Sequence, residues 1–270
     1  LGPDDLLLVL VSGGGSSLLA APVEGVTLKE LRQVTRALLH AGASIHDINT
    51  VRKHLTRLSG GQLAQAAQAA HGLALIISDV VGDDPGSIAS GPCAPDASSC
   101  VDALDQLQRL RITPPEGVRH HLETCAAGRL PDTPKPGDAC FARMENRVIA
   151  SAHGSLMAAV RYFEQHGIPA LLLSDKVRGY AQSVARQHAA LVHSLARRQT
   201  LALISGGETT VALQPRHGLG GRNSEFLLAL ALALRETPAW AIACDTDGID
   251  GSEDNAGALL TPDTLVRARA

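Results

Sequence analysis

The sequence predicts an α/β protein of two domains, each built on a mainly parallel sheet flanked by helices. Short apolar runs alternate along the chain with segments whose apolar residues recur at helical spacing, a pattern typical of parallel sheets covered by helices. A proline-rich stretch at 111–138 interrupts this alternation and predicts an inter-domain connection. We therefore place one domain at 1–138 and the second at 139–270. Hydrophobic residues make up 45% of the chain but aromatic residues only 2%, so aliphatic side chains must build both cores.

The first domain is predicted to hold two buried strands with helices between them. The run at 6–11 is continuously apolar, as expected of a buried parallel strand, and 73–77 has the same character. Apolar residues recur at helical spacing over 27–41 behind a capping-box pattern, which predicts a helix there. The alanine- and glutamine-rich segment at 61–71 predicts another helix, and 118–125 suits a short helix within the proline-rich stretch.

A second series of alternating elements follows. Strands are predicted at 147–150, 170–173, 201–204 and 240–243, and helices at 155–165, 182–197 and 225–234. Ligands of such sheets bind at the carboxyl ends of the strands, so functional residues are expected in the loops that follow strands.

The loop after the first strand has the composition of an anion-binding turn. It contains Ser12, Gly13, Gly14, Gly15 and Ser16. Three glycines expose backbone N–H groups and tolerate positive φ, so the chain can wrap around an anionic group. A flexible turn has the same composition, and the residues alone leave that alternative open.

A second glycine-rich loop carries Gly206, Gly207 and Glu208, and Arg222 and Asn223 follow it at the start of a predicted helix. The planar guanidinium of arginine matches phosphate or carboxylate, which favours an anionic ligand here. A structural salt bridge between Arg222 and a nearby glutamate is the alternative.

Two further loops after strands are acidic. One contains Asp79, and the other contains Asp245 and Asp247. Carboxylate oxygens can hold Mg²⁺, and those of the second loop can also bind a ligand hydroxyl. A helix cap or a solvated turn is the structural alternative. The second loop is not an EF-hand, because Ile249 stands where that loop needs an acid.

A cationic segment lies in the first domain. Asn49 is followed by Arg52 and Lys53, whose charges can clamp phosphate or carboxylate, although adjacent cations also occur on solvated surfaces. His54 is expected to have a packing role.

Absent patterns narrow the function further. There is no Walker-type phosphate loop, no G-x-G-x-x-G fingerprint, no G-x-S-x-G elbow, and neither H-E-x-x-H nor paired CxxC for zinc. A net charge of −3 without a basic stripe argues against nucleic-acid binding, and no apolar run is long enough to span a membrane.

Five cysteines without a CxxC pair indicate reduced thiols in a cytoplasmic protein. Glycine-rich cradles, cations and carboxylates at strand ends remain, and phosphoryl transfer needs these groups.

Six motifs together resemble a known family. In order along the chain they are 12–16 (SGGGS), 49–53 (NTVRK), 78–83 with 88–92, 205–211, 220–223 (GGRN), and 245–251 with 255–257. This set resembles the glycerate 2-kinase family with a MOFRL carboxy-terminal domain, whose members are often called hydroxypyruvate reductases. The resemblance extends over 6–267.

The resemblance implies phosphorylation of D-glycerate on its 2-hydroxyl, with ATP and Mg²⁺, in a cleft between two α/β domains. By position, Arg222 would stabilise the transferring phosphoryl group or bind the substrate carboxylate. Lys53 and the 12–16 loop would bind anionic groups. Asp79, Asp245 and Asp247 are the candidate metal ligands. Glycerate and ATP are the implied partners, and the oligomeric state is left open, with a homodimer as one option.

The chain also departs from the family pattern. Family members are longer, and an amino-terminal glycine-rich segment with a lysine thought to act in catalysis has no counterpart before Leu1. We therefore expect a chain truncated at both ends, with weak or no turnover. NAD(P)H-dependent hydroxypyruvate reduction and a fragment that only binds ligand are the alternative functions.

Overall fold

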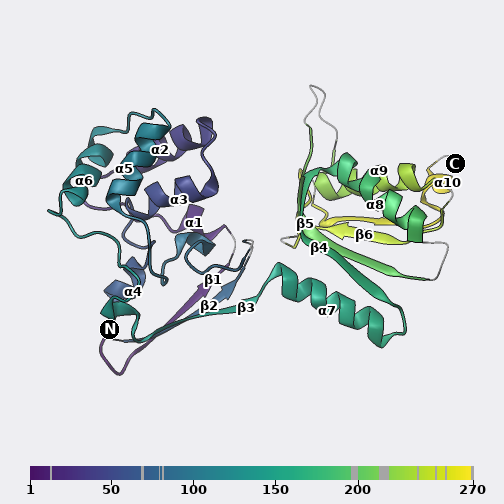
Figure 1. The fold of residues 1–270 in the computed structure, drawn as a ribbon, viewed down its shortest axis with the longest axis horizontal. Coiled ribbons are helices and arrows are strands. Elements are labelled where there is room, and N and C mark those ends of the chain that lie inside the picture. The colour runs from purple at the N-terminus through teal and green to yellow at the C-terminus, as the bar shows by residue number, and fades with distance from the viewer. Residues whose placement is uncertain are drawn as a thin grey trace. The chain divides into compact units, whose positions relative to one another are not determined.

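The computed structural model describes residues 1–270 apart from 13, 68–69, 79, 81, 196–199, 213–218, 236, 247, 253 and 269–270. The chain forms two compact units, Leu1–Ser151 and Ala152–Ala270 (Figure 1). None of the helices in the described ranges has the length and apolarity needed to cross a lipid bilayer.

A three-stranded parallel sheet lies in the first unit. Strands β1 (Leu6–Val11), β2 (His71–Ile77) and β3 (Met144–Ala150) are arranged in that order. The inner strand β2 buries Ala74 and Ile76, whereas Leu6, Leu8 and Leu10 of β1 are exposed. The expectation of a buried strand therefore holds for one face of β2 and not for β1.

Strand β3 lies in the first unit, although 147–150 was predicted as the first strand of the second domain. It pairs in parallel with β2 from Gly72↔Met144 to Ile77↔Ala150. Because these hydrogen bonds tie β3 to the first sheet, the two units divide after Ser151 and not after 138.

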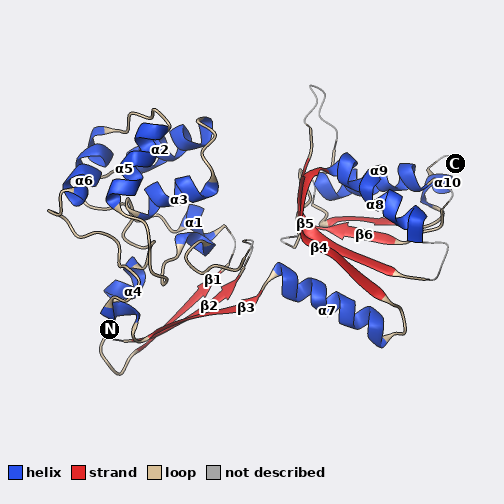
Figure 2. Ribbon diagram, viewed as in Figure 1, coloured by secondary structure: helices blue, strands red, loops and turns tan. Residues whose placement is uncertain are grey.

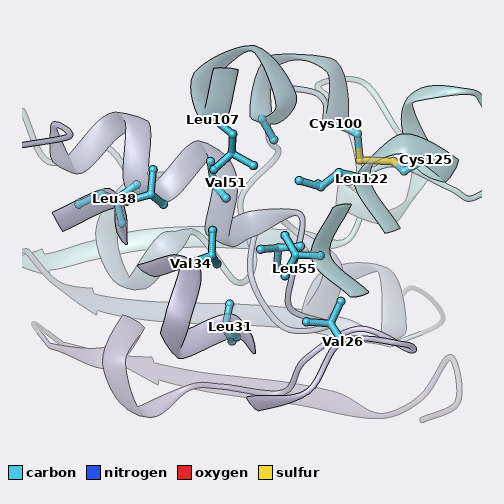
Figure 3. Close-up of a cluster of buried hydrophobic side chains, with 13 residues drawn as sticks. Val26, Leu31, Val34, Leu38, Val51, Leu55, Cys100, Leu107, Leu122 and Cys125 are labelled. Carbon is cyan, nitrogen blue, oxygen red and sulfur yellow. A yellow bond between two sulfur atoms is a disulfide. The ribbon is translucent and has the colours of Figure 1, made fainter. Parts of the chain in front are cut away.

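Four helices form the larger core of the first unit. They are α2 (Leu28–His40), α3 (Ile45–Lys53), α5 (Cys100–Arg109) and α6 (Glu116–Ala126). Capping boxes begin α2, α3 and α5, so reciprocal hydrogen bonds satisfy N–H groups at each start. Their aliphatic side chains meet in one buried cluster (Figure 3). The predicted connection at 111–138 is thus partly core, because α6 buries one face against the other helices.

The same cluster contains a disulfide between Cys100 and Cys125, with Cα atoms 6.0 Å apart (Figure 3). The expectation that all five cysteines are reduced thiols is therefore wrong for this pair. Packing of α5 against α6 brings together two residues that lie far apart in the sequence. Cys93, Cys140 and Cys244 are free.

Short elements complete the first unit. They are helices α1 (Gly15–Leu18) and α4 (Gln62–Ala66), and 3₁₀ turns η1 (Ile88–Ser90) and η2 (Ala139–Phe141). The helix predicted at 61–71 is therefore shorter, and the strand predicted at 73–77 begins earlier, at His71.

The second unit combines helices with a parallel and an antiparallel strand pair. In chain order it contains α7 (Ala152–Gln165), β4 (Ala170–Tyr180), α8 (Ala181–Leu195), β5 (Ala202–Thr210), α9 (Arg222–Leu234), β6 (Ala241–Cys244), β7 (Gly257–Leu260) and α10 (Thr264–Arg267). Strands β4 and β5 are parallel, while β6 and β7 are antiparallel. Helices α8 and α9 lie on one side of the strands and α7 on the other (Figure 2). Small alanines of α8 pack against leucines of α9 in the core.

A fully buried carboxylate fixes the start of α9. Asp250 accepts the backbone N–H groups of Asn223 (2.9 Å) and Ser224 (2.8 Å), and the Ser224 hydroxyl (2.6 Å). These are N–H groups that the first turn of a helix cannot satisfy internally, and the positive end of the helix favours the charge. A Cβ on Gly221 would lie 2.4 Å from the Asp250 carbonyl carbon, so the close approach requires glycine.

We expect Leu38→Ala to destabilise the first unit by about 2–5 kcal/mol, because it deletes a fully buried side chain and leaves a cavity. Leu39→Ala on the same helix is the matched control, since Leu39 is 58% exposed. Urea unfolding followed by circular dichroism would measure both. If both variants lowered the free energy of unfolding equally, the packing described for Leu38 would be contradicted.

We expect Asp250→Asn to destabilise the second unit by about 1–3 kcal/mol near neutral pH, because a hydrogen-bonded charge is lost. Burial alone would raise the pKa of Asp250, but hydrogen bonds from Ser224 and Asn223 hold it below the ordinary value. The ionised Asp250 carboxylate therefore stabilises the folded unit fully above its pKa in the unfolded chain, which is about 3.9. This stabilisation is lost as the pH falls through the lower pKa that Asp250 has in the folded protein. Unfolding between neutral and strongly acidic pH should show a smaller pH dependence for the variant. If the variant and the parent lost the same free energy of unfolding at acidic pH, the stabilising role of ionised Asp250 would be contradicted.

Candidate functional site

Arg222, the first residue of α9, lies at the centre of a charged cluster in the second unit. Its Nε and Nη2 donate to the two carboxylate oxygens of Asp245, at 3.1 and 2.9 Å. Its Nη1 donates to Glu208 Oε1 at 2.6 Å. Asn223 adds an amide hydrogen bond to Asp245 at 3.0 Å. Of the predicted residues, the structure therefore brings Arg222, Asn223, Glu208 and Asp245 together.

The two carboxylates that contact Arg222 differ in exposure. The Asp245 side chain is 17% exposed and holds the guanidinium through two parallel hydrogen bonds, which fixes its plane. The Glu208 side chain is 75% exposed and contacts a single nitrogen. Hydrogen bonds to Asp245 and then Glu208 raise the pKa of Arg222 further, so it is a permanent cation. An incoming anion can replace the exposed Glu208 while Asp245 keeps the guanidinium oriented.

Gly206, Gly207 and Glu208 lie on strand β5, not in a loop after it. Strand β4 extends to Tyr180, and the pairs Val177↔Gly207 and Arg178↔Glu208 continue the parallel register. Gly207 has a φ of 144°, and a Cβ there would lie 2.2 Å from the Val177 carbonyl oxygen. The glycines thus allow close pairing of two strands in this structure.

Of the three predicted metal ligands, only Asp245 lies among the described residues. Asp79 and Asp247 lie outside those residues. Both carboxylate oxygens of Asp245 accept hydrogen bonds from Arg222, and one also accepts from Asn223, so a divalent cation there would compete with these donors. A metal role for these three aspartates stays a prediction.

A second cluster, in the first unit, joins three of the sequence motifs. The hydroxyls of Ser16 and Ser90 are 2.9 Å apart, and Ser90 donates to Asn49 Oδ1 at 3.2 Å. Arg52 donates to the backbone carbonyl of Ser16. Helix α3 thereby places Asn49 and Arg52 against the glycine-rich turn, and burial lowers the pKa of the Arg52 guanidinium.

The glycine-rich turn at 12–16 uses the conformational freedom of its glycines. Gly14 adopts a left-handed conformation (φ 75°) before α1, and the Gly15 N–H donates to the Ser12 carbonyl at 3.4 Å. A Cβ on Gly15 would lie 3.0 Å from the Ala89 Cβ, so this turn packs closely on η1. Gly13 lies outside the described residues.

Ser90, which was not among the predicted site residues, is in a strained segment. Ala89 and Ser90 have φ angles of 50° and 61°, which are uncommon for residues with a Cβ. Hydrogen bonds from the Gly60 and Gly61 amides to the carbonyls of Ser90 (2.9 Å) and Gly91 (2.8 Å) hold the backbone there. Such strain concentrates at functional sites, and the motif at 88–92 was the only sign of it in the sequence.

Lys53 and His54 lie in a neighbouring buried polar cluster. Lys53 Nζ is 3.4 Å from Asp96 Oδ1, and His54 Nε2 is 3.0 Å from Asp132 Oδ1. Burial opposes ionisation of Asp132, but hydrogen bonds from His54 and the Cys100 amide hold its pKa well below the usual range. His54 is thus buried as expected, yet it serves a polar network as well as packing.

Family models match both parts of the chain. Residues 1–123 match a model described as a domain of unknown function (DUF4147), and 201–270 match the MOFRL family.

Individual relatives align over nearly the whole chain. A putative hydroxypyruvate reductase from Agrobacterium vitis is 47% identical over 100% of this chain and 61% of its own length. A glycerate kinase from Macaca fascicularis is 36% identical over 99% of this chain and 78% of its own length. The crystal structure of glycerate kinase from Thermotoga maritima has a TM-score of 0.87 at 36% identity, and covers 100% of this chain and 64% of that chain.

The chain therefore spans less than two thirds of the Agrobacterium and Thermotoga proteins. The resemblance stated from the six motifs is confirmed by matches at both ends of the chain. With the macaque kinase covered over 78% of its length, the chain belongs to the glycerate kinase family, in which some members carry the name hydroxypyruvate reductase.

Proposed function

We propose that this protein is a glycerate 2-kinase, which transfers the γ-phosphoryl group of ATP to the 2-hydroxyl of D-glycerate and forms 2-phosphoglycerate. The observation that carries the proposal is the guanidinium of Arg222, held in plane by Asp245 with one edge on the exposed Glu208. Family membership supports the same assignment, since relatives in the family are named glycerate kinases.

Arg222 would act on the transferring group or on the substrate carboxylate. Phosphoryl transfer spreads negative charge over the oxygens of the moving group, and a fixed guanidinium stabilises that charge without reorganising. Exchange of Glu208 for a phosphoryl or carboxylate oxygen would keep the Arg222 charge neutralised. The bidentate contact with Asp245 would hold the arginine in place during that exchange.

A second anion-binding cluster would lie within the first unit. The turn at 12–16 and the side chains of Asn49 and Arg52 form one hydrogen-bonded cluster, as described above. Backbone N–H groups of a glycine-rich turn suit the phosphates of a nucleotide. Lys53 would be the second cation there, once released from Asp96.

Magnesium is expected for a kinase because the ion would neutralise negative charge on the phosphate groups of the nucleotide. Among the described residues, the candidate ligand Asp245 is already paired with the guanidinium of Arg222. We therefore assign no step of the reaction to a protein-bound metal here.

The reaction can be tested directly on the chain. Incubation with ATP, Mg²⁺ and D-glycerate, followed by ³¹P NMR, should show at most slow formation of 2-phosphoglycerate, in line with the weak turnover expected of this chain, and none without the protein. A parallel assay with hydroxypyruvate and NADH should show no oxidation of NADH. Turnover in the second assay alone would replace the proposal with the reductase, and ATP binding with no turnover would indicate a fragment that only binds its ligand.

We expect Arg222→Lys to lower kcat for glycerate phosphorylation by about 10³-fold, because lysine cannot reproduce the planar fork that arginine presents to the phosphoryl group. Arg267→Lys is the matched control, since Arg267 is exposed and pairs with Asp263, the N-cap residue of α10. Steady-state assays of both variants would measure the effect. Comparable kcat values for the two variants would remove Arg222 from the mechanism.

A further inference from the structure

Three side chains that commonly bind metal ions, those of His54, Cys100 and Asp132, meet in the first unit, and the disulfide joins Cys125 to Cys100. His54 follows α3, Cys100 begins α5, Cys125 lies near the end of α6, and Asp132 is in the segment beyond α6. His54 Nε2 is 3.0 Å from Asp132 Oδ1, and Cys100 Sγ is 3.8 Å from the same oxygen. The two sulfur atoms are bonded to each other. We call these four residues the Cys-His-Asp cluster.

The ring of His54 is oriented as a metal ligand would be. Its Nδ1 lies 2.7 Å from the Thr50 carbonyl oxygen, which can only accept, so Nδ1 carries the proton. Nε2 then faces Asp132 at 3.0 Å and Asp96 at 3.8 Å. The Thr133 hydroxyl also lies 3.4 Å from Nε2, and a second proton on the ring or a cation between these groups would balance the carboxylates. A backbone carbonyl that fixes the opposite nitrogen is a usual support for zinc-bound histidine.

We propose that the protein binds one Zn²⁺ at the Cys-His-Asp cluster when the Cys100–Cys125 disulfide is reduced. Zinc prefers four ligands of this kind, and its bond lengths place tetrahedral N and O ligands roughly 3.3 Å apart and S and O ligands roughly 3.5 Å apart. The observed separations of 3.0 Å and 3.8 Å lie close to both values.

The disulfide decides whether the site can form. Two thiolates on one tetrahedral zinc ion lie roughly 3.8 Å apart, so bonded sulfurs cannot both be ligands. A dithiol reductant delivers two electrons and two protons to the S–S bond, and is itself oxidised to a disulfide. The two thiols formed then lose their protons as Zn²⁺ binds the thiolates. This proposal is independent of the kinase activity.

A cavity beside the Cys-His-Asp cluster and the nearby charge of Lys135 are consistent with a zinc site. A cavity of about 190 Å³ is lined by His54, Cys100 and Asp132, among other residues, and provides an entry path for an ion or a reductant. Lys135 Nζ lies 3.3 Å from Asp132 Oδ1 and competes for the proposed ligand atom. Its side chain is 35% exposed, so it can move to solvent when a divalent cation binds. Removal of this ammonium should therefore strengthen zinc binding.

The test uses the full chain carrying Cys244→Ser, which removes the exposed free thiol as a source of adventitious binding. Protein reduced with a dithiol and desalted without oxygen is titrated with Zn²⁺ against a chromogenic chelator, beside the oxidised protein. We expect one Zn²⁺ per reduced chain and none per oxidised chain. Cobalt in place of zinc should give the absorption bands of a tetrahedral, thiolate-ligated ion.

Three further variants in the same background distinguish metal ligands from residues that do not bind the ion. Cys100→Ser should weaken binding at least about 100-fold, since even changes to groups that support ligands cost about 10–100-fold. Cys140→Ser, at another buried free thiol, is the matched control and should bind as the parent does. Lys135→Met should bind more tightly than the parent.

Thermal unfolding provides a measurement that does not depend on a substituted ligand. Zinc should raise the unfolding temperature of the reduced parent and leave that of the oxidised parent unchanged. Equal zinc uptake by the reduced and oxidised parent would overturn the proposal, as would no uptake by the folded, reduced protein. Binding that survives Cys100→Ser would overturn it as well.

Discussion

The buried carboxylate of Asp250 is the constraint on which the charged cluster of the second unit depends. By accepting the first free N–H groups of α9, it fixes where the helix begins, and Arg222 is the first residue of that helix. Gly221 allows the helix start to approach the Asp250 backbone closely. The position of the guanidinium therefore follows from backbone hydrogen bonds, and Asp245 then sets its plane.

In the first unit, the end of α3 connects two polar clusters. Three successive residues have different partners: Arg52 donates to the Ser16 carbonyl, Lys53 pairs with Asp96, and His54 faces Asp132. The capping box at Ser44 and the buried Ile48 and Val51 hold the helix that orients them.

Local sequence patterns predicted the structural features that depend only on residues close together in the chain. The capping box of α2, the helix at 118–125 and an arginine at a helix start all follow from spacing within one segment. Features that depend on distant partners were missed. Strand β5 continues through Gly206 and Gly207 because β4 pairs with it, β3 joins the first sheet through β2, and Cys100 meets Cys125 only after α5 and α6 pack.

Strand β1 has a consequence for handling the protein. Leu6 and Leu10 are 64% and 74% exposed on the same face of a strand that pairs on one side, with β2, in the described part of the sheet. Backbone groups along the other side of such a strand, beside exposed leucines, form a template for intermolecular β-pairing. Concentrated solutions of this chain should therefore self-associate, and a charged residue at Leu8 would counter that tendency by electrostatic repulsion between strands.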